Sequence, residues 1–273
     1  MKHTIEVFSP LLGSFGFDGT LDELKNVGLT NLDLNLGAGL WSVAQPGEKP
    51  LEIPAKEIEK RAEGLKAQAA AKGVTLSTVS CFVDFEKPEM KETIKRCLKI
   101  GQVVGATTLV TGSGQDPAAA IPALKDLGRY ADTCGLNIAM ETHPPMGHNA
   151  VYSLWTLMDV KHPRIKLNYD TANIYYYNHK IDGEAELRKL IQHVGHLHIK
   201  DSRKGFHENF FPALGDGVID LRKIFDILDE AGFKGNASIE IEGPAALGEA
   251  ATPENIRKAL KRSVEHLAKV GVI

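Results

Sequence analysis

The hydrophobic and polar positions of the chain follow two periods, one typical of strands and one typical of helices. Every second residue of 30–37 is polar, so Asn31, Asp33 and Asn35 share one face and leucines occupy the other. Residues 53–72 follow a helical period rich in Ala, Lys and Glu, and Gly73 suits the position after the helix end. Strand-like and helix-like segments continue to alternate to residue 269, which predicts parallel β-α units.

The pattern predicts eight strands, each followed by a helix. The strands are expected at 4–10, 30–37, 75–82, 107–111, 136–141, 165–170, 194–201 and 237–242. The helices are expected from about Thr20, where Thr20 and Glu23 have the spacing of a capping box, and at 53–72, 88–104, 117–134, 153–160, 184–192, 220–231 and 253–269. Eight such units favour a single closed (β/α)8 TIM barrel, one domain over residues 1–273, rather than an open doubly wound sheet. No GxGxxG follows the first strand, which disfavours a dinucleotide-binding fold.

Composition narrows the class of partner. The 273 residues carry a formal net charge of −3 and show no basic stripe, so we expect no nucleic-acid partner. The three cysteines, Cys81, Cys97 and Cys134, are widely spaced and odd in number, which is typical of buried thiols in a reducing compartment. No apolar run approaches the length of a membrane span, and no signal-peptide pattern opens the chain. We therefore expect a cytoplasmic protein with a small-molecule partner; a homo-oligomer stays open.

One predicted strand, at 194–201, carries three basic groups on a single face. The strand period places His196, His198 and Lys200 on the same side. Burying an unpaired polar group costs roughly 2–7 kcal/mol. These side chains should therefore face a metal, a carboxylate or a wet cavity.

Partners for this face come from the neighbouring strands, because a TIM barrel builds its active site at the C-terminal ends of its strands. The last inward-facing polar residues of the final four predicted strands are Glu141, Asp170, His198 and Glu240. Each alone could be a surface carboxylate, a turn residue or a core histidine. Three carboxylates and an imidazole that converge need a cation, because like charges in a buried pocket raise one another's pKa. Oxygen-rich ligands with one imidazole suit Mn²⁺ or Mg²⁺, while Zn²⁺ and Co²⁺ also fit.

Spacing leaves two choices open and suggests further contacts. His196 shares a face with His198, and Glu242 shares a face with Glu240. Lys200 could place a positive charge at a substrate oxygen or pair with Asp201. The remaining candidates come from the predicted loops at the same barrel face: His143 and His148 as hydroxyl contacts or surface residues, and Phe15, Trp41 and Phe211 as an apolar wall or as loop packing.

Four short runs carry a resemblance to a known family. They are Ala139–His143 (AMETH), Leu167–Asn173 (LNYDTAN), His196–Asp201 (HLHIKD), and Gly232–Gly235 (GFKG) before Ser238–Glu240 (SIE). Together they resemble the xylose isomerase-like TIM barrel superfamily, and within it the sugar phosphate isomerase/epimerase group. That group includes the ketose 3-epimerases, hydroxypyruvate isomerase and inosose dehydratase. The resemblance implies one divalent metal ion, with His198 and Glu240 as ligands rather than His196 and Glu242.

The chain departs from the ketose 3-epimerases at three positions. Those enzymes have a substrate-contacting histidine three residues after the metal aspartate, where this chain has Asn173. They have a glutamate six residues after the first metal glutamate, here Gly147, and an arginine six residues after the metal histidine, here Lys204. The residues expected to contact the substrate are Lys200, Asn173, His143, Trp41 and Lys204.

The resemblance implies an isomerase or epimerase of a sugar, sugar phosphate or polyol ketone. Glu141 and Glu240 would lie on opposite faces of the substrate as the catalytic residues, with proton abstraction next to a carbonyl through a metal-stabilised enediolate. The main alternative is a dehydratase of the inosose or dehydroshikimate type, which shares the first step. An endonuclease IV-like hydrolase is disfavoured, because no histidine lies between His3 and His143. A non-catalytic sugar sensor is disfavoured by the presence of all four metal residues.

Overall fold

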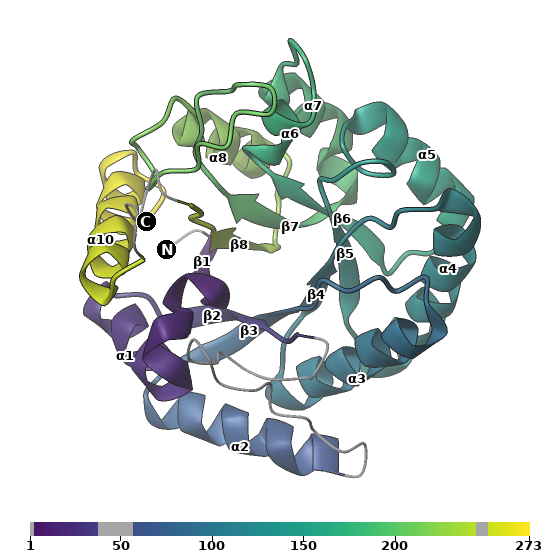
Figure 1. Cartoon of the computed structure of the whole chain (residues 1–273), viewed down its shortest axis with the longest axis horizontal. Helices are drawn as coiled ribbons and strands as arrows, with labels where there is room; N and C mark the ends of the chain where they lie inside the picture. The colour runs from purple at the N-terminus through teal and green to yellow at the C-terminus, as the bar shows by residue number, and fades with distance from the viewer. Residues whose placement is uncertain (1–2, 38–56, 244–250) are drawn as a thin grey trace.

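The computed structural model describes residues 3–37, 57–243 and 251–273, and it shows a closed barrel of parallel strands (Figure 1). Neighbouring strands pair in sequence order, and the last pairs with the first. The predicted (β/α)8 barrel is confirmed. Its strands are β1 (Thr4–Phe8), β2 (Asn31–Asn35), β3 (Thr75–Ser80), β4 (Thr108–Thr111), β5 (Asn137–Glu141), β6 (Ile165–Asp170), β7 (Val194–Ile199) and β8 (Asn236–Ile239).

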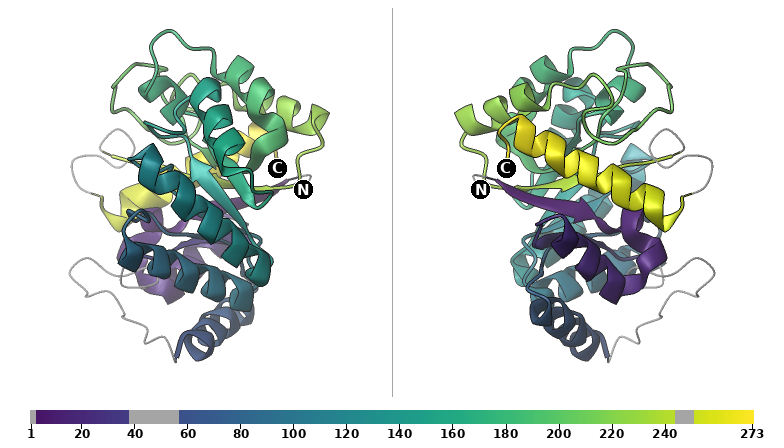
Figure 2. Two further views of the ribbon diagram at one scale, coloured as in Figure 1. Left: turned by 90° about the vertical axis from the view of Figure 1, so that its right-hand side faces the viewer. Right: turned by 90° about the vertical axis from the view of Figure 1, so that its left-hand side faces the viewer.

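Helices form a ring outside the strands, as the two side views show (Figure 2). The helices are η1 (Ser9–Phe15), α1 (Gly16–Asn26), α2 (Ile58–Ala71), α3 (Pro88–Val104), α4 (Pro117–Cys134), α5 (Ala150–Val160), α6 (Asn173–Tyr176), α7 (Gly183–Leu190), η3 (Ile191–His193), α8 (Leu221–Glu230) and α10 (Pro253–Lys269). Within the described residues, no helix is both long and apolar enough to cross a membrane.

The predicted start of the first helix is wrong. The chain leaves β1 as the 3₁₀-helix η1, and α1 begins at Gly16, four residues before Thr20. Gly16 has a φ of 65°, a left-handed value that costs glycine little and lets one helix follow the other directly. The Thr20 hydroxyl therefore lies inside α1, donates to the Leu12 carbonyl oxygen at 3.2 Å, and forms no capping box with Glu23.

Side-chain caps explain other differences in the bounds. Helix α5 begins earlier than predicted because Asn149 accepts hydrogen bonds from the backbone N–H groups of Val151 and Tyr152. Asp182 caps α7 in the same way through Ala185. The four-residue helix α6 was not predicted, because one turn is too short to show a helical period.

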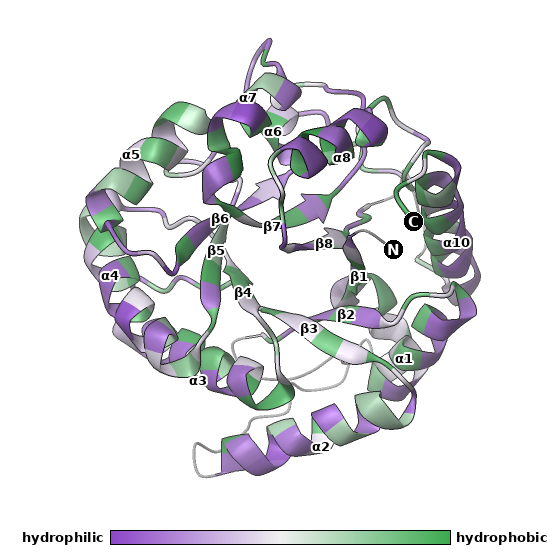
Figure 3. Ribbon diagram, turned by 180° about the vertical axis from the view of Figure 1, so that it is seen from behind, coloured by the Kyte–Doolittle hydropathy of each residue, from purple (hydrophilic) through white to green (hydrophobic). Residues whose placement is uncertain are grey.

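The barrel separates an apolar outer layer from a polar interior. Apolar side chains of the strands face the helices, as do Leu32 and Leu34 of β2, which are fully buried. Helix α10 shows the matching division, with a hydrophobic side toward the barrel and a hydrophilic side away from it (Figure 3). The three cysteines are buried and unpaired, as predicted. The polar faces of the strands are thus enclosed by the barrel, where they can meet.

Candidate metal and active site

Four side chains converge inside the barrel at the C-terminal ends of β5 to β8. They are Glu141, Asp170, His198 and Glu240, the residues predicted from the strand pattern. Each offers one donor atom, and these atoms all lie within 4.8 Å of one another. All four residues are buried. The arrangement is a compact set of three oxygens and one nitrogen.

The strand ends position this cluster. Glu141 and Asp170 are the last residues of β5 and β6, and His198 lies one residue before the end of β7. Asp170 and His198 are cross-strand partners, while Ser238 of β8 pairs with His198 and places Glu240 just beyond. Asp170 is anchored further by the backbone N–H groups that open α6, which donate to its Oδ1 at 2.8 Å. Its other oxygen, Oδ2, is left for the cluster.

The His198 imidazole lies among the carboxylates. Its Nδ1 is 2.8 Å from Glu141 Oε1 and 3.0 Å from Glu240 Oε2. The Phe8 ring, at the end of β1, packs against it with ring centroids 5.1 Å apart. The apolar Phe8 ring thus covers one side of the imidazole.

The two choices left open by spacing have distinct places in the structure. His196 lies deeper in the barrel, with Nε2 2.9 Å from Glu6 Oε1 and Nδ1 2.9 Å from Asn168 Oδ1. Glu242 lies at the rim, with its side chain 49% exposed. His198 and Glu240 are therefore the members of each pair that reach the cluster.

Lys200 supplies a positive charge beside the cluster. Its Nζ lies 3.2 Å from Asp170 Oδ2, 3.0 Å from Glu240 Oε2 and 3.1 Å from Glu242 Oε2. The side chain is 3% exposed. The suggested pairing with Asp201 is wrong, because within the described residues the Lys200 ammonium pairs with these three carboxylates and the Asp201 carboxylate accepts backbone N–H groups.

Asp201 instead organises the long loop after β7. Its carboxylate accepts backbone N–H groups from Ser202, Gly215, Gly217 and Ile219. The same loop carries Phe211, whose ring centroid lies 4.9 Å from the Lys200 ammonium.

The cluster fits a divalent cation, because two of its buried carboxylate oxygens lack a hydrogen-bond donor within the described part of the chain. Asp170 Oδ2 and Glu240 Oε2 are buried and have no hydrogen-bond partner among the described residues. Lys200 lies within ion-pair distance of both, without the geometry of a hydrogen bond. Buried carboxylates ordinarily have donors or a metal ion. Three oxygen donors and one imidazole nitrogen are a set that suits a divalent cation.

The crowded charges shift the titration of the cluster. Burial raises the pKa of Asp170 to about 7, although the Lys200 ammonium favours its ionised form. Burial opposes charge on His198 and Lys200, but the surrounding carboxylates outweigh it and raise both pKa values well above their ordinary range. Burial also acts against ionised Glu240, yet Lys200 and His198 hold its pKa below its usual range. When no metal is bound, bound protons and the Lys200 ammonium offset the negative charge of the carboxylates.

This titration predicts a steep pH dependence of metal binding. A metal must displace the protons of Asp170 and His198, so affinity should rise with pH. We expect the apparent Kd for Mn²⁺ to fall by at least about tenfold between pH 5 and pH 6 and to continue falling above pH 7. Calorimetric titration at four pH values measures this. An apparent Kd that does not change with pH would contradict this balance of charges.

A cavity of about 290 Å³ opens from the cluster toward solvent. Its lining combines metal-cluster carboxylates with aromatic, amide and ammonium groups, which suits a small polyhydroxylated molecule. The lining residues are Glu141, His143, Asn173, Tyr176, Tyr177, Lys200, Asn209, Phe211, Glu240 and Glu242. A second cavity, of about 260 Å³, lies on the β3–β4 side of Glu141 and includes Phe82 and Ser113. Glu141 is therefore reached from both sides.

His143 and Tyr177 form a polar pair beside Glu141. The Tyr177 hydroxyl is 3.0 Å from His143 Nε2, which lies 3.5 Å from Glu141 Oε2. Burial lowers the pKa of His143, so its imidazole is neutral at neutral pH. Burial raises the pKa of Tyr177 to about 12, which keeps its phenol protonated as a hydrogen-bond donor.

Several predicted contact residues lie elsewhere. Lys204 pairs with Glu184 at 3.2 Å and does not line the cavity. Phe15 lies under the Arg257 guanidinium, and the His148 ring contacts the Tyr152 ring at a tilt of 34°. Of the expected apolar wall, Phe211 alone reaches the cavity within the described residues. Trp41 lies outside those residues.

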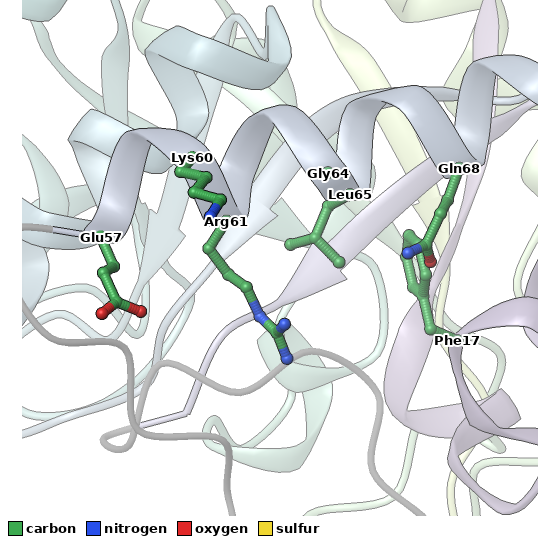
Figure 4. Close-up of a pocket in the computed structure, with 7 residues that line it drawn as sticks. All are labelled: Phe17, Glu57, Lys60, Arg61, Gly64, Leu65 and Gln68. Atoms are coloured by element: carbon green, nitrogen blue, oxygen red, sulfur yellow. The ribbon is translucent and has the colours of Figure 1, made fainter.

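Other hollows lack this chemistry. One of about 360 Å³ lies beside α2, and the Gln68 side chain lies next to Phe17 of α1 at one end of it (Figure 4). Its other lining residues are Glu57, Lys60, Arg61, Gly64 and Leu65. Two groups of described residues have a geometry that could hold a metal ion, and both consist of residues other than those that line this hollow. Three of the described residues that line this hollow are charged, and none of its lining residues belongs to either group.

Sequence reasoning did not anticipate Tyr176, Tyr177 and Asn209. Tyr176 and Tyr177 come from α6 and the residue after it, and Asn209 comes from the long loop. The run of three tyrosines shortly after Asn173 was a visible signal for the first two. Asn209 had no signal, because loop positions follow no period.

Comparison with known proteins places the chain in a family of TIM barrels. The family described as xylose isomerase-like TIM barrel matches residues 36–270. The inosose dehydratase of Klebsiella pneumoniae is 30% identical over 140 residues, which cover 44% of this chain and 46% of that protein. The inosose dehydratase of Geobacillus thermodenitrificans is 30% identical over 146 residues, 46% of this chain and 47% of that one. The chain thus matches about half the length of these relatives.

Solved structures match over almost the whole chain. D-psicose 3-epimerase from Clostridium cellulolyticum H10 superposes with a TM-score of 0.74 at 15% identity, covering 98% of this chain and 99% of that one. A probable 3-DHS dehydratase from Bacillus anthracis gives 0.72 at 16% identity, with 98% and 99% covered. At these identities the likeness concerns the fold.

Proposed function

Because the chain belongs to the xylose isomerase-like TIM barrel family, we propose that it is a metal-dependent dehydratase of a small polyhydroxylated ketone. The reaction begins with removal of a proton from the carbon next to the carbonyl and ends with loss of water. The cluster of Glu141, Asp170, His198 and Glu240, of which Glu141 and Glu240 line the cavity, carries this proposal. When bound there, a divalent ion would polarise the carbonyl and acidify the neighbouring C–H bond.

Glu141 is the base in this proposal. It lines both cavities, so a substrate in either one presents a C–H bond to its carboxylate. The proton that Glu141 takes then passes to the departing hydroxyl group. The C–H and C–O bonds break, a carbon–carbon double bond forms, and water leaves.

The other cavity residues bind and orient the ketone. Lys200 Nζ and the Asn173 side chain line the cavity and can contact its oxygens. Tyr177 donates a hydrogen bond on the side of Glu141 and positions the leaving hydroxyl. Phe211 packs against the Lys200 ammonium and gives the cavity an apolar side.

Two observations favour elimination over epimerisation. The Klebsiella and Geobacillus relatives are inosose dehydratases. Asn173, Gly147 and Lys204 occupy positions where the ketose 3-epimerases carry different residues, and Lys204 pairs with Glu184 outside the cavity. Isomerisation or epimerisation is the second candidate. Epimerisation is supported by the presence of both Glu141 and Glu240 in the cavity lining. Inverting a carbon centre needs one group to remove the proton and another to return it on the opposite face of the substrate.

A substrate panel in deuterated water separates these reactions. The purified protein with Mn²⁺ is incubated with inososes, dehydroshikimate, ketoses and hydroxypyruvate, and mass spectrometry scores both water loss and deuterium uptake. We expect a product lighter by one water from a cyclic ketone, and none after chelation of the metal. Deuterated isomers without water loss would instead establish the epimerase. Metal-independent turnover would contradict both.

A further inference from the structure

The second nitrogen of His198 faces a carboxylate that the proposed chemistry does not use. While Nδ1 points at Glu141 and Glu240, His198 Nε2 lies 3.7 Å from Asp33 Oδ2 on the opposite side of the ring. Both side chains are fully buried. His198 Nε2 has no hydrogen-bond partner among the described residues. A buried ring nitrogen in this position needs an acceptor or a donor.

Asp33 is held with its carboxylate toward this nitrogen. It belongs to the polar face of β2 that alternates with buried leucines. The Ser80 hydroxyl donates to Asp33 Oδ1, and the Ser238 hydroxyl donates to Oδ2 at 3.0 Å. His198 is the basic residue at ion-pair distance from Asp33 within the described part of the chain. Two hydroxyls thus fix the carboxylate without neutralising it.

A metal-binding histidine needs such a group. Histidines that bind a metal through one ring nitrogen almost always donate the other N–H to a carboxylate, a carbonyl or water, which fixes the tautomer and the ring orientation. We propose that Asp33 is the positioning residue for His198. It accepts the Nε2–H when Nδ1 is the metal ligand, and a small rotation of the ring shortens the 3.7 Å separation to a hydrogen bond. This inference rests on the proposed role of His198 as a metal ligand.

Glu6, a second buried carboxylate inside the barrel, contacts His196 instead of His198. Glu6 is equally buried, and its two oxygens accept from the Ser77 and Thr78 hydroxyls. Glu6 Oε1 lies 2.9 Å from Nε2 of His196, the histidine that does not reach the cluster. Glu6, Asp33 and His196 could in principle hold a second ion, but the carboxylate oxygens already have hydroxyl donors. Glu6 is therefore a matched control for Asp33.

The test compares Asp33→Asn, Glu6→Gln and His198→Gln by calorimetric titration of the metal-free proteins with Mn²⁺. We expect Asp33→Asn to raise the Kd by about 10–100-fold, the usual effect of losing such a partner. Glu6→Gln should leave the Kd within about threefold, because Glu6 contacts His196. Ser80→Ala, which removes one hydroxyl from Asp33 without touching His198, should weaken binding in the same direction and less.

A spectroscopic readout separates positioning from general damage. With a single histidine ligand, the Co²⁺-loaded protein should show one strongly shifted, exchangeable imidazole N–H proton by NMR. In Asp33→Asn this proton should exchange with solvent much faster, whereas Glu6→Gln should leave it unchanged. Equal losses of affinity in Asp33→Asn and Glu6→Gln, or an unchanged N–H signal in Asp33→Asn, would overturn the role of Asp33. Unchanged Mn²⁺ binding in His198→Gln would overturn the metal site itself.

Discussion

Replacing Glu141 by glutamine is expected to abolish turnover of the ketone substrate. The change keeps the size of the side chain and removes the carboxylate that we propose as the base. General acid–base catalysis contributes about 10²–10⁴-fold, so deuterium exchange and water loss should both fall by at least that factor. The protein should remain folded, because the glutamine side chain has the same size and its amide oxygen can still accept a hydrogen bond from His198 Nδ1. Turnover and exchange are measured on the substrate identified by the panel.

Glu240→Gln and Glu242→Gln are the comparisons for this variant. Glu240 lies in the cluster and Glu242 at the rim, although both pair with Lys200 at 3.0–3.1 Å. In a dehydratase with a single base, Glu240→Gln should weaken metal binding and leave exchange measurable once metal is saturating. In a two-base epimerase it should block formation of the isomer. Glu242→Gln should keep the metal affinity. If Glu141→Gln retained undiminished exchange, Glu141 would not be the base.

The fold was predictable from the sequence where the strand period was unbroken. The strand Ile165–Asp170 was predicted with its observed bounds, because Lys166, Asn168 and Asp170 alternate with apolar residues through the whole element. The start of α1 was not predictable, because it depends on a left-handed Gly16 rather than on a side-chain cap.

The four-residue cluster was predictable because equivalent strand ends of a barrel must meet. How deep each residue lies in the barrel was not predictable, since His196 and His198 share a face and differ only in depth. That depth depends on the stagger between strands: Asn168 pairs with His196, and Asp170 pairs with His198. The contact of Asp33 with His198 crosses the barrel, between strands that are not neighbours, and no local pattern could indicate it.

Lys200→Met should destabilise the metal-free protein more than any of the carboxylate-to-amide substitutions in the cluster. The Lys200 ammonium is enclosed by Asp170, Glu240 and Glu242, and its removal leaves buried carboxylates without their cation. Breaking a buried ion pair on one side costs about 3–5 kcal/mol. For a chain of this size the metal-free protein should lose roughly 6–20 °C in Tm. Differential scanning calorimetry in the presence of a chelator measures this shift.

A divalent ion should restore much of that loss, because it supplies the positive charge that Lys200 no longer provides. The increase in Tm on adding saturating Mn²⁺ should therefore be larger for Lys200→Met than for the unmodified protein. Lys258→Met is the matched control, since Lys258 pairs with Glu254 at 2.6 Å but both side chains are exposed. Such a surface pair contributes at most about 1 kcal/mol, and Mn²⁺ should not alter its effect. A Mn²⁺ response equal in Lys200→Met and the unmodified protein would show that Lys200 and the metal do not balance the same carboxylates.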